Sequence, residues 1–113
     1  MDLKGIRIAF REVAAGLPVA GGERSMLAFE RGSVTVKLYA PRGEDLQQPH
    51  TRDELYVVAR GSGVFVCGPT GVSFGANDVL FAPAGLEHRF ENFSEDLFVW
   101  VIFYGPEGGE VSS

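Results

Sequence analysis

Turn-forming residues recur along this chain at short, nearly regular intervals, and this spacing restricts the fold more than any other feature of the sequence. Each turn contains glycine, proline or asparagine, and the turns lie at 21–22, 31–32, 41–43, 61–63, 68–71, 75–78, 83–85 and 105–106. Most of the segments between them are rich in β-branched and aromatic residues, namely 34–39, 55–59, 64–67, 72–74, 79–82 and 97–104. Short strands joined by close turns predict an all-β chain, folded as an antiparallel sandwich or barrel.

The polarity pattern within these runs predicts which strands are covered on both faces. In the run 34–39 apolar residues alternate with more polar ones, as expected for a strand with one wet face. The run 97–104 is apolar on both faces and therefore needs cover on each side, either from the barrel interior plus the N-terminal segment or from a second subunit. We predict a homodimer on this basis.

The first 33 residues differ from the strand-rich remainder. The segment Ile8–Ala15 can form a short helix ended by Gly16 and Pro18, although its apolar spacing fits a strand nearly as well. We predict the helix. The expected organisation is an N-terminal extension at 1–33 that packs on the barrel or on a partner, a β-barrel at 34–104 and a C-terminal tail at 105–113.

Length, charge and cysteine content restrict the class of protein. A chain of 113 residues forms one domain, and its net charge of -5, with no basic stripe between aromatics, makes nucleic acid an unexpected partner. The single Cys67 cannot form an internal disulfide, and the N-terminus has no long apolar run and no small-residue cleavage site. We therefore expect a cytoplasmic location and no membrane span.

Both histidines of the chain lie in two short polar blocks that a β-rich interval separates. The first block contains Gln48, His50 and Glu54, and the second contains His88 after a Pro-Ala-Gly turn. Side chains alternate along an extended strand, so Gln48 and His50 share a face, which Glu54 joins if the chain keeps its register. Two imidazoles, a carboxylate and a carboxamide can then converge on one cation. Taken singly, each residue has an ordinary reading, as a packed histidine or a charge at a strand edge.

These two blocks resemble the motifs of the small single-domain cupins over roughly residues 34–104. The second cupin motif has a turn residue, Pro-x-Gly, a ligand histidine and then asparagine, which correspond here to Asn77, Pro83, Gly85, His88 and Asn92. Asn77 stands where the family usually has glycine and suits the same positive φ. The first motif is matched at His50, Glu54 and Gly61, whereas Gln48 takes the place of its first histidine. The resemblance implies a jelly-roll barrel, an antiparallel double-stranded β-helix.

The resemblance also implies a divalent metal ion held by His50, Glu54 and His88, with Gln48 as an optional fourth ligand. Two imidazoles and one carboxylate suit Fe(II) or Mn(II) with open positions, and also Zn(II) or Ni(II). A carboxamide oxygen at Gln48 is a harder and weaker donor than imidazole, so the ion is expected to be held less firmly. Asp53 is an alternative carboxylate, but its parity in the strand is opposite to that of His50.

The neighbours of the ligands predict a mostly apolar cavity for a small molecule. Tyr56 shares the face of Glu54, and a buried phenol needs a hydrogen-bond partner. The cavity wall is completed by one face of the last strand, and sequence leaves open which face. The resemblance allows a metal-dependent dioxygenase, isomerase, decarboxylase or lyase acting on a small oxygenated substrate, with Glu54 or Tyr56 placed to move a proton. The alternative is a non-catalytic module that binds a small ligand or a metal.

Overall fold

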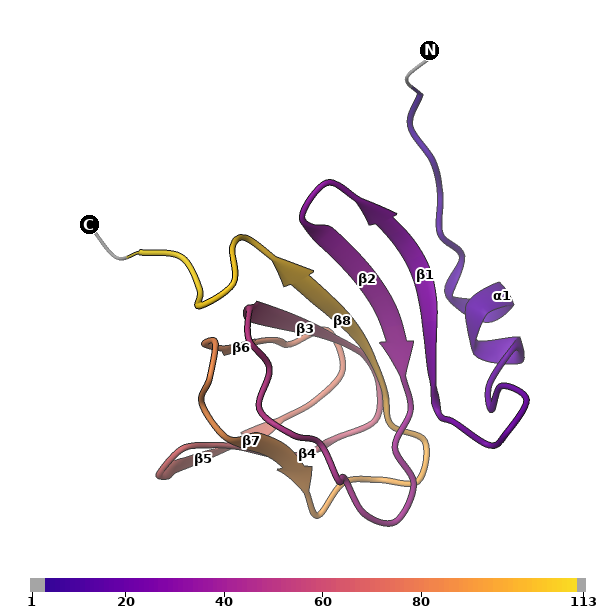
Figure 1. Cartoon of the computed structure of the whole chain (residues 1–113). Coiled ribbons are helices and arrows are strands. Elements are labelled where there is room, and N and C mark those ends of the chain that lie inside the picture. Colours follow the sequence, from indigo (N-terminus) through magenta and orange to yellow (C-terminus); the bar gives the residue numbers. More distant parts are fainter. Residues whose placement is uncertain (1–3, 112–113) are drawn as a thin grey trace.

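The computed structural model describes residues 4–111, and strands dominate this part of the chain (Figure 1). Five strands form one sheet in the order β1-β2-β8-β3-β6, and three form a second sheet in the order β5-β4-β7. Every paired strand is antiparallel to its neighbour. The strands are β1 (Ser25–Arg31), β2 (Val34–Tyr39), β3 (Asp53–Arg60), β4 (Gly63–Cys67), β5 (Thr70–Phe74), β6 (Val79–Ala82), β7 (His88–Glu91) and β8 (Phe98–Tyr104).

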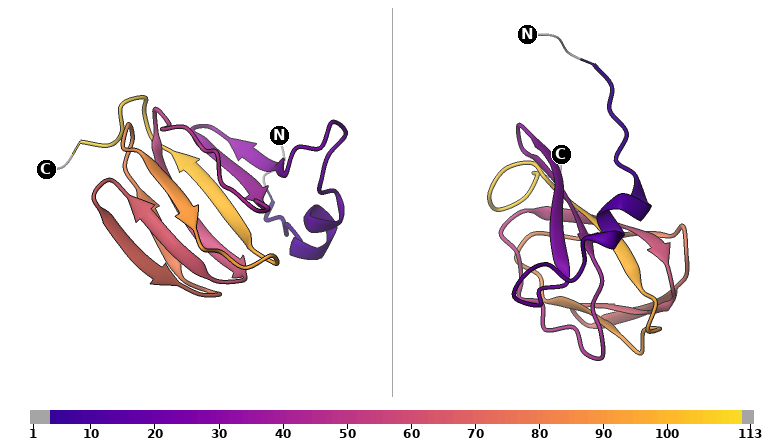
Figure 2. Two further views of the ribbon diagram at one scale, coloured as in Figure 1. Left: turned by 90° about the horizontal axis from the view of Figure 1, so that it is seen from below. Right: turned by 90° about the vertical axis from the view of Figure 1, so that its right-hand side faces the viewer.

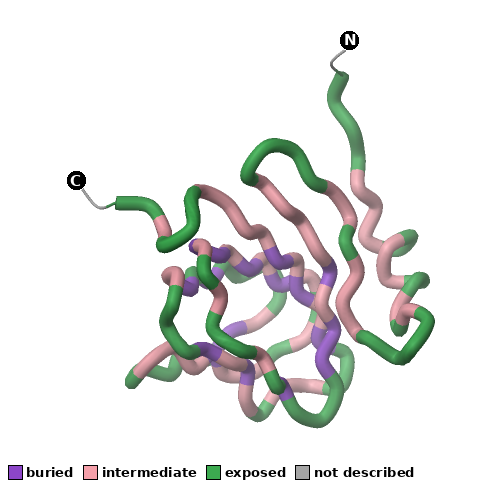
Figure 3. Tube along the Cα trace, in the orientation of Figure 1, coloured by how far each residue is buried: buried purple, intermediate pink, exposed green. Residues whose placement is uncertain are grey.

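The two sheets face each other and enclose the core, as the views along and across the strands show (Figure 2). The buried stretches of the chain lie mainly on the strands that face one another (Figure 3). Buried residues recur at alternate positions along β3, β6, β7 and β8, so one face of each of these strands points into this space, as in a jelly-roll barrel. The fully or almost fully buried apolar residues of the cluster include Tyr56, Val58, Phe90, Leu97 and Val99.

The strands predicted from sequence all form, and two of them, Val34–Tyr39 and Val79–Ala82, have the predicted bounds. The other four differ by one or two residues at their ends, where turn residues also join the ladder. Strand β1 was not predicted. It is a mixed sequence with a register shift between Leu27 and Phe29 that disturbs its alternation, so its pattern does not stand out.

The predicted helix forms as α1 (Phe10–Ala15), and Gly16 caps its C-terminus. The Phe10 ring packs edge-on against Phe98 and Trp100, with centroid distances of 5.3 and 6.3 Å. The N-terminal segment therefore covers part of the outer face of β8, which is one of the two covers that its apolar pattern requires. In residues 4–111 no helix has the length and apolar character needed to cross a bilayer.

Two turn positions have the backbone that the motifs require. Asn77 has a φ of 74°, the left-handed conformation expected of the residue that stands where glycine is usual. Gly61 has a φ of 93°, and a Cβ there would lie 2.8 Å from the Leu97 Cα. Glycine at position 61 therefore allows the end of β3 to pass close to the start of β8.

Candidate metal centre

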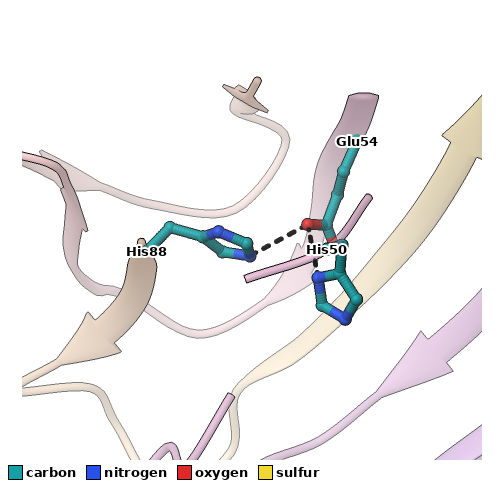
Figure 4. Close-up of side chains that lie close together, drawn as sticks. All are labelled: His50, Glu54 and His88. Carbon is teal, nitrogen blue, oxygen red and sulfur yellow. Dashed lines mark ion pairs between the residues drawn. The ribbon is translucent and has the colours of Figure 1, made fainter. Parts of the chain in front are cut away.

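Three side chains that are distant in sequence or in secondary structure converge inside the barrel (Figure 4). The Glu54 Oε1 lies 2.9 Å from the His88 Nε2 and 3.2 Å from the His50 Nδ1. His88 and Glu54 are almost completely buried, and the His50 side chain is 38% exposed. The donor atoms of all three lie within 4.8 Å of one another.

Strand register explains why these residues meet. Glu54 lies near the start of β3, opposite Ala82 on β6 and Phe103 on β8, and its side chain points to the barrel interior. His88 begins β7 in the smaller sheet, opposite Cys67. The two residues therefore approach from opposing sheets. His50 precedes β3 in a loop, where its carbonyl accepts a hydrogen bond from the Gly85 N–H and joins the two motifs.

The hydrogen bonding of His88 determines which of its nitrogens faces the cluster as an acceptor. Its Nδ1 lies 2.9 Å from the Leu86 carbonyl oxygen, which can only accept, so Nδ1 carries the proton. The neutral ring therefore directs the Nε2 lone pair toward Glu54. A histidine fixed in this way by a backbone carbonyl is the usual arrangement of a metal ligand.

The atoms at the centre of the cluster are buried without hydrogen-bond partners. Within residues 4–111 these are the His50 Nδ1, both carboxylate oxygens of Glu54 and the His88 Nε2. The two contacts to Glu54 are close, but neither has the geometry of a hydrogen bond. Buried polar atoms without partners are costly, and one cation would satisfy the two imidazole nitrogens and one oxygen of Glu54 at once.

The donor separations also fit an ion of ordinary size. Two ligands at right angles, each about 2.1 Å from one ion, are about 3.0 Å apart. The contacts of 2.9 and 3.2 Å to Glu54 Oε1 are close to this value. The residues present therefore fit a divalent first-row metal, and the set of two imidazoles and one carboxylate leaves coordination positions for a small molecule.

The charge of Glu54 changes the proton affinity of His88. Burial by itself lowers the pKa of His88, but the contact with Glu54, the Leu86 carbonyl and the charge of Asp45 together outweigh it and raise this pKa above the usual value for histidine. Without a metal, a proton shared between His88 and Glu54 relieves the conflict between two acceptors. A metal would have to displace that proton.

A cavity of about 580 Å³ opens beside the cluster. Val101 and Phe103 of β8 lie in its wall, and Leu97 and Val99 of the same face are buried in the core. The inward face of the last strand is thus the set Leu97, Val99, Val101 and Phe103, which sequence left open. The Phe103 ring packs against His50, with ring centroids 4.8 Å apart.

Tyr56 is fully buried and belongs to a hydrogen-bonded chain of polar groups. Its hydroxyl donates to the Gln47 Oε1 at 2.8 Å, and the Gln47 Nε2 donates to the Asp45 Oδ2 at 2.7 Å. Asp45 also accepts hydrogen bonds from the Tyr39 hydroxyl and from the Phe90 N–H. Burial, and then the charge of Glu54, raise the pKa of Tyr56 far above its usual value, so the phenol stays protonated.

Sequence reasoning missed Gln47 and Asp45, which lie in a loop outside both motifs. Gln47 lines the cavity, and Asp45 is buried. A weak signal existed, since Gln47 is adjacent to the residue in the first motif position and carries the same carboxamide. No strand alternation applies there, because residues 45–50 lie outside the strands.

The other two expected ligand candidates lie away from the cluster. Gln48 is exposed and does not line the cavity. Asp53 points away from Glu54, as its opposite parity predicted, and its carboxylate accepts hydrogen bonds from the Ala84 and Glu110 N–H groups. Asp53 thus connects the second motif to the chain after β8. The loop 105–111 is held there, since the Gly108 N–H also donates to the Thr51 carbonyl.

Comparison with known proteins identifies the same region. A model of the cupin domain family (Cupin_2) matches residues 35–104. An uncharacterized protein of Streptomyces coelicolor is 36% identical over 91 residues, which cover 78% of this chain and 87% of that protein. A cupin 2 conserved barrel domain protein of Salinispora arenicola has a TM-score of 0.67 at 18% identity, covering 92% of this chain and 91% of its own. A protein of Thermus thermophilus has a TM-score of 0.68 at 22% identity, covering 92% and 97%.

Proposed function

This chain belongs to the cupin domain family, and from that premise we propose that it binds a divalent metal ion through His50, Glu54 and His88. The observation that carries the proposal is the convergence of four buried polar atoms that have no hydrogen-bond partner within residues 4–111. Burial of unpaired acceptors lowers stability unless a cation binds there. Measurement of the metal content will identify the metal among iron, manganese, zinc and nickel.

We further propose that the protein is a metal-dependent enzyme acting on a small oxygenated molecule. A bound ion would supply Lewis acidity, or dioxygen chemistry if it is redox-active. The chain supplies the rest of the site. Val101 and Phe103 exclude water from one side of the cavity, and His50 lies at its partly exposed edge. A dioxygenase, an isomerase and a lyase each use a site of this kind.

Glu54 is the residue of this site best placed to move a proton. Its Oε1 contacts both imidazoles, whereas its Oε2 has no hydrogen-bond partner within residues 4–111. Oε2 can therefore accept a proton from a molecule bound in the cavity. Tyr56, the other residue expected to act on a proton, stays protonated and donates to Gln47, so its proposed role is to orient polar groups beside Glu54.

The alternative function is a non-catalytic module that binds a metal or a small ligand. The observation in its favour is that Gln48 is exposed, which leaves three ligands rather than four. Gln48 acts as a fourth ligand only if its loop moves toward the cluster. A Gln48→His variant that binds metal more tightly than wild type supports that role, and an unchanged affinity removes it.

The metal content of protein purified without chelators or a histidine tag tests the proposal. Plasma mass spectrometry is expected to find about one equivalent of a divalent metal, or titration calorimetry about one equivalent taken up. The His50→Ala/His88→Ala variant is expected to bind none. Glu107→Gln, which removes an exposed carboxylate outside the cavity, is the matched control and keeps the metal. No metal in wild type, before or after titration, contradicts the proposal.

Turnover distinguishes the two functions once the metal is known. Metal-loaded wild-type protein is screened against small hydroxy, oxo and enol compounds. Activity that disappears in a folded Glu54→Gln protein supports the enzyme. A compound that binds the metal-loaded protein but is never turned over supports the binding module.

A further inference from the structure

We infer that Lys37 forms an anion subsite in the metal cavity and that the molecule bound there carries a carboxylate. The inference rests on the proposed metal site, because it assigns the second point of attachment of the same ligand. Lys37 lines the cavity together with His50, Glu54 and Phe103. Lys37 is half-buried, and a lysine on the inner face of a barrel strand is unusual, since this residue type is mostly exposed.

Strand register places Lys37 on the inner face of the five-stranded sheet. It pairs with Val101 on β8, which in turn pairs with Tyr56 on β3. The next inward row is Thr35, Phe103 and Glu54. Neighbouring strands are about 4.8 Å apart, so the Cα of Lys37 lies about 10 Å from that of Tyr56 and about 12 Å from that of Glu54. The four-carbon side chain of lysine covers about half of that separation.

The polar residues of β2 were predicted to lie on the outer, wet face of the sheet. They lie instead on the inner face, where Lys37 and Tyr39 border the cavity. Thr35, Lys37 and Tyr39 share the inner face, whereas Leu38, which is completely buried, lies on the opposite face. Polar and apolar residues do alternate along β2, but the polar side faces the interior of the barrel. Lys37 therefore has a position that surface solubility does not explain.

The ammonium group of Lys37 lies near an aromatic ring and is not neutralised. Within residues 4–111 no carboxylate lies within 4 Å of its Nζ. The Nζ is 6.0 Å from the centroid of the Phe103 ring, which also packs against His50. A cation near an aromatic face gains only a weak attraction, so all three N–H donors of Lys37 can bind a ligand.

The other cations around the cavity already donate to the protein. The Arg24 guanidinium donates to the Ala40 carbonyl, and that of Arg42 donates to the Pro41 and Leu97 carbonyls. Arg52 lines a neighbouring pocket rather than this cavity, and it donates to the Ser33 carbonyl and the Thr35 hydroxyl. Lys37 is the cation of the cavity lining for which the structure gives no hydrogen bond to residues 4–111.

The charges around Lys37 favour a carboxylate over a phosphate group. Glu23, Glu44 and Glu54 also line the cavity, and the chain as a whole has a net charge of -5. Each additional negative charge on a ligand is therefore repelled, which disfavours a dianion more than a monoanion. A single ammonium balances one carboxylate. The expected ligand is a small, partly apolar acid whose second oxygen reaches the metal position.

The chain contains two lysines, Lys4 and Lys37, which permits a direct test. Reductive methylation with ¹³C-formaldehyde labels both and keeps their charge. In zinc-loaded protein, 2-hydroxybenzoate is expected to shift the Lys37 methyl signal and to leave that of Lys4 unchanged. The neutral analogue 2-hydroxybenzamide is expected to shift neither. Lys37→Met is expected to weaken 2-hydroxybenzoate binding about tenfold or more, with Lys4→Met as the matched control.

The readouts separate failure of the subsite from failure of the metal site. Zinc content is measured on each sample and is expected to be the same in wild type, Lys37→Met and Lys4→Met. Two results overturn the subsite and leave the metal site intact. In one, wild type holds zinc but 2-hydroxybenzoate does not shift the Lys37 methyl signal. In the other, Lys37→Met binds 2-hydroxybenzoate with unchanged affinity. Wild type that holds no zinc contradicts the metal proposal instead. Tighter binding of phenyl phosphate than of 2-hydroxybenzoate overturns the choice of a carboxylate.

Discussion

The substitution Glu54→Gln is expected to stabilise the metal-free protein and to remove most of the stabilisation that zinc gives to wild type. The Glu54 side chain is 1% exposed, and neither of its oxygens has a hydrogen-bond partner within residues 4–111. A glutamine amide can donate to the His88 Nε2 from the position of Oε1, 2.9 Å away. The substitution thus replaces a buried unpaired charge with a neutral donor.

The size of the effect follows from the cost of an unpaired buried acceptor, about 1–3 kcal/mol. Globular proteins unfold with an entropy of about 2.1 cal/mol/K per residue, so for this chain about 1 kcal/mol corresponds to about 4 °C in Tm. Without metal, Glu54→Gln is expected to unfold about 4–12 °C above wild type. Zinc at 100 times its Kd stabilises wild type by about 2.7 kcal/mol, whereas the variant loses most of this gain.

Thermal unfolding followed by circular dichroism at pH 8.5, with EDTA or with zinc, measures both effects. The pH matters because the pKa of His88 is raised, and a protonated imidazole would form an ion pair with Glu54. Glu107→Gln removes an exposed carboxylate and is expected to change stability by no more than about 0.5 kcal/mol. A Glu54→Gln protein that is less stable than wild type in EDTA refutes the view that the cluster is strained without metal.

Three further predictions concern other parts of the barrel. Hydrogen bonds from the backbone N–H groups of Glu110 and Ala84 lower the pKa of Asp53. The carboxylate of Asp53 therefore stabilises the fold above about pH 4, and this contribution is lost as the pH falls through the lowered pKa. Urea unfolding across pH is expected to show the loss in wild type and not in Asp53→Asn. Gln47→Ala removes the acceptor of the Tyr56 hydroxyl and is expected to cost about 1 kcal/mol in urea unfolding, against no more than about 0.5 for the exposed Gln48→Ala. The predicted homodimer would cover Phe81 on β6, which is 48% exposed. Sedimentation is therefore expected to give a dimer for wild type at micromolar concentration and a monomer for Phe81→Lys. A monomeric wild type contradicts the dimer prediction.

The dimer prediction depends on which apolar residues remain exposed on the outer face of the five-stranded sheet. Phe10 covers Phe98 and Trp100 on β8, but Val79 and Phe81 on the edge strand β6 remain 62% and 48% exposed. Helix α1 therefore accounts for part of the apolar pattern that suggested a partner. The exposed residues of β6 are the part that a second subunit would explain.

Local sequence determined the strands, the turns and the identity of the candidate metal ligands. Alternation and turn residues act over a few positions, so β2 and β6 were predicted to the residue, and Asn77 adopts the positive φ expected of it. The resemblance to cupins similarly gave His50, Glu54 and His88, because a motif is a fixed spacing of residue types. Strand β1 escaped this reasoning, since its bulge interrupts the alternation on which the prediction depends.

Only the tertiary structure decided which face of each strand is the interior and which side chains the cavity brings together. The pattern of β2 showed a polar face, but only the pairing of β2 with β8 and of β8 with β3 places Lys37 in the same cavity as Glu54. Gln47 and Asp45 likewise enter the site through a loop, where neither alternation nor motif spacing applies. Alternation determines that two faces differ, whereas long-range pairing determines what each face meets, because strand register joins residues that are far apart along the chain.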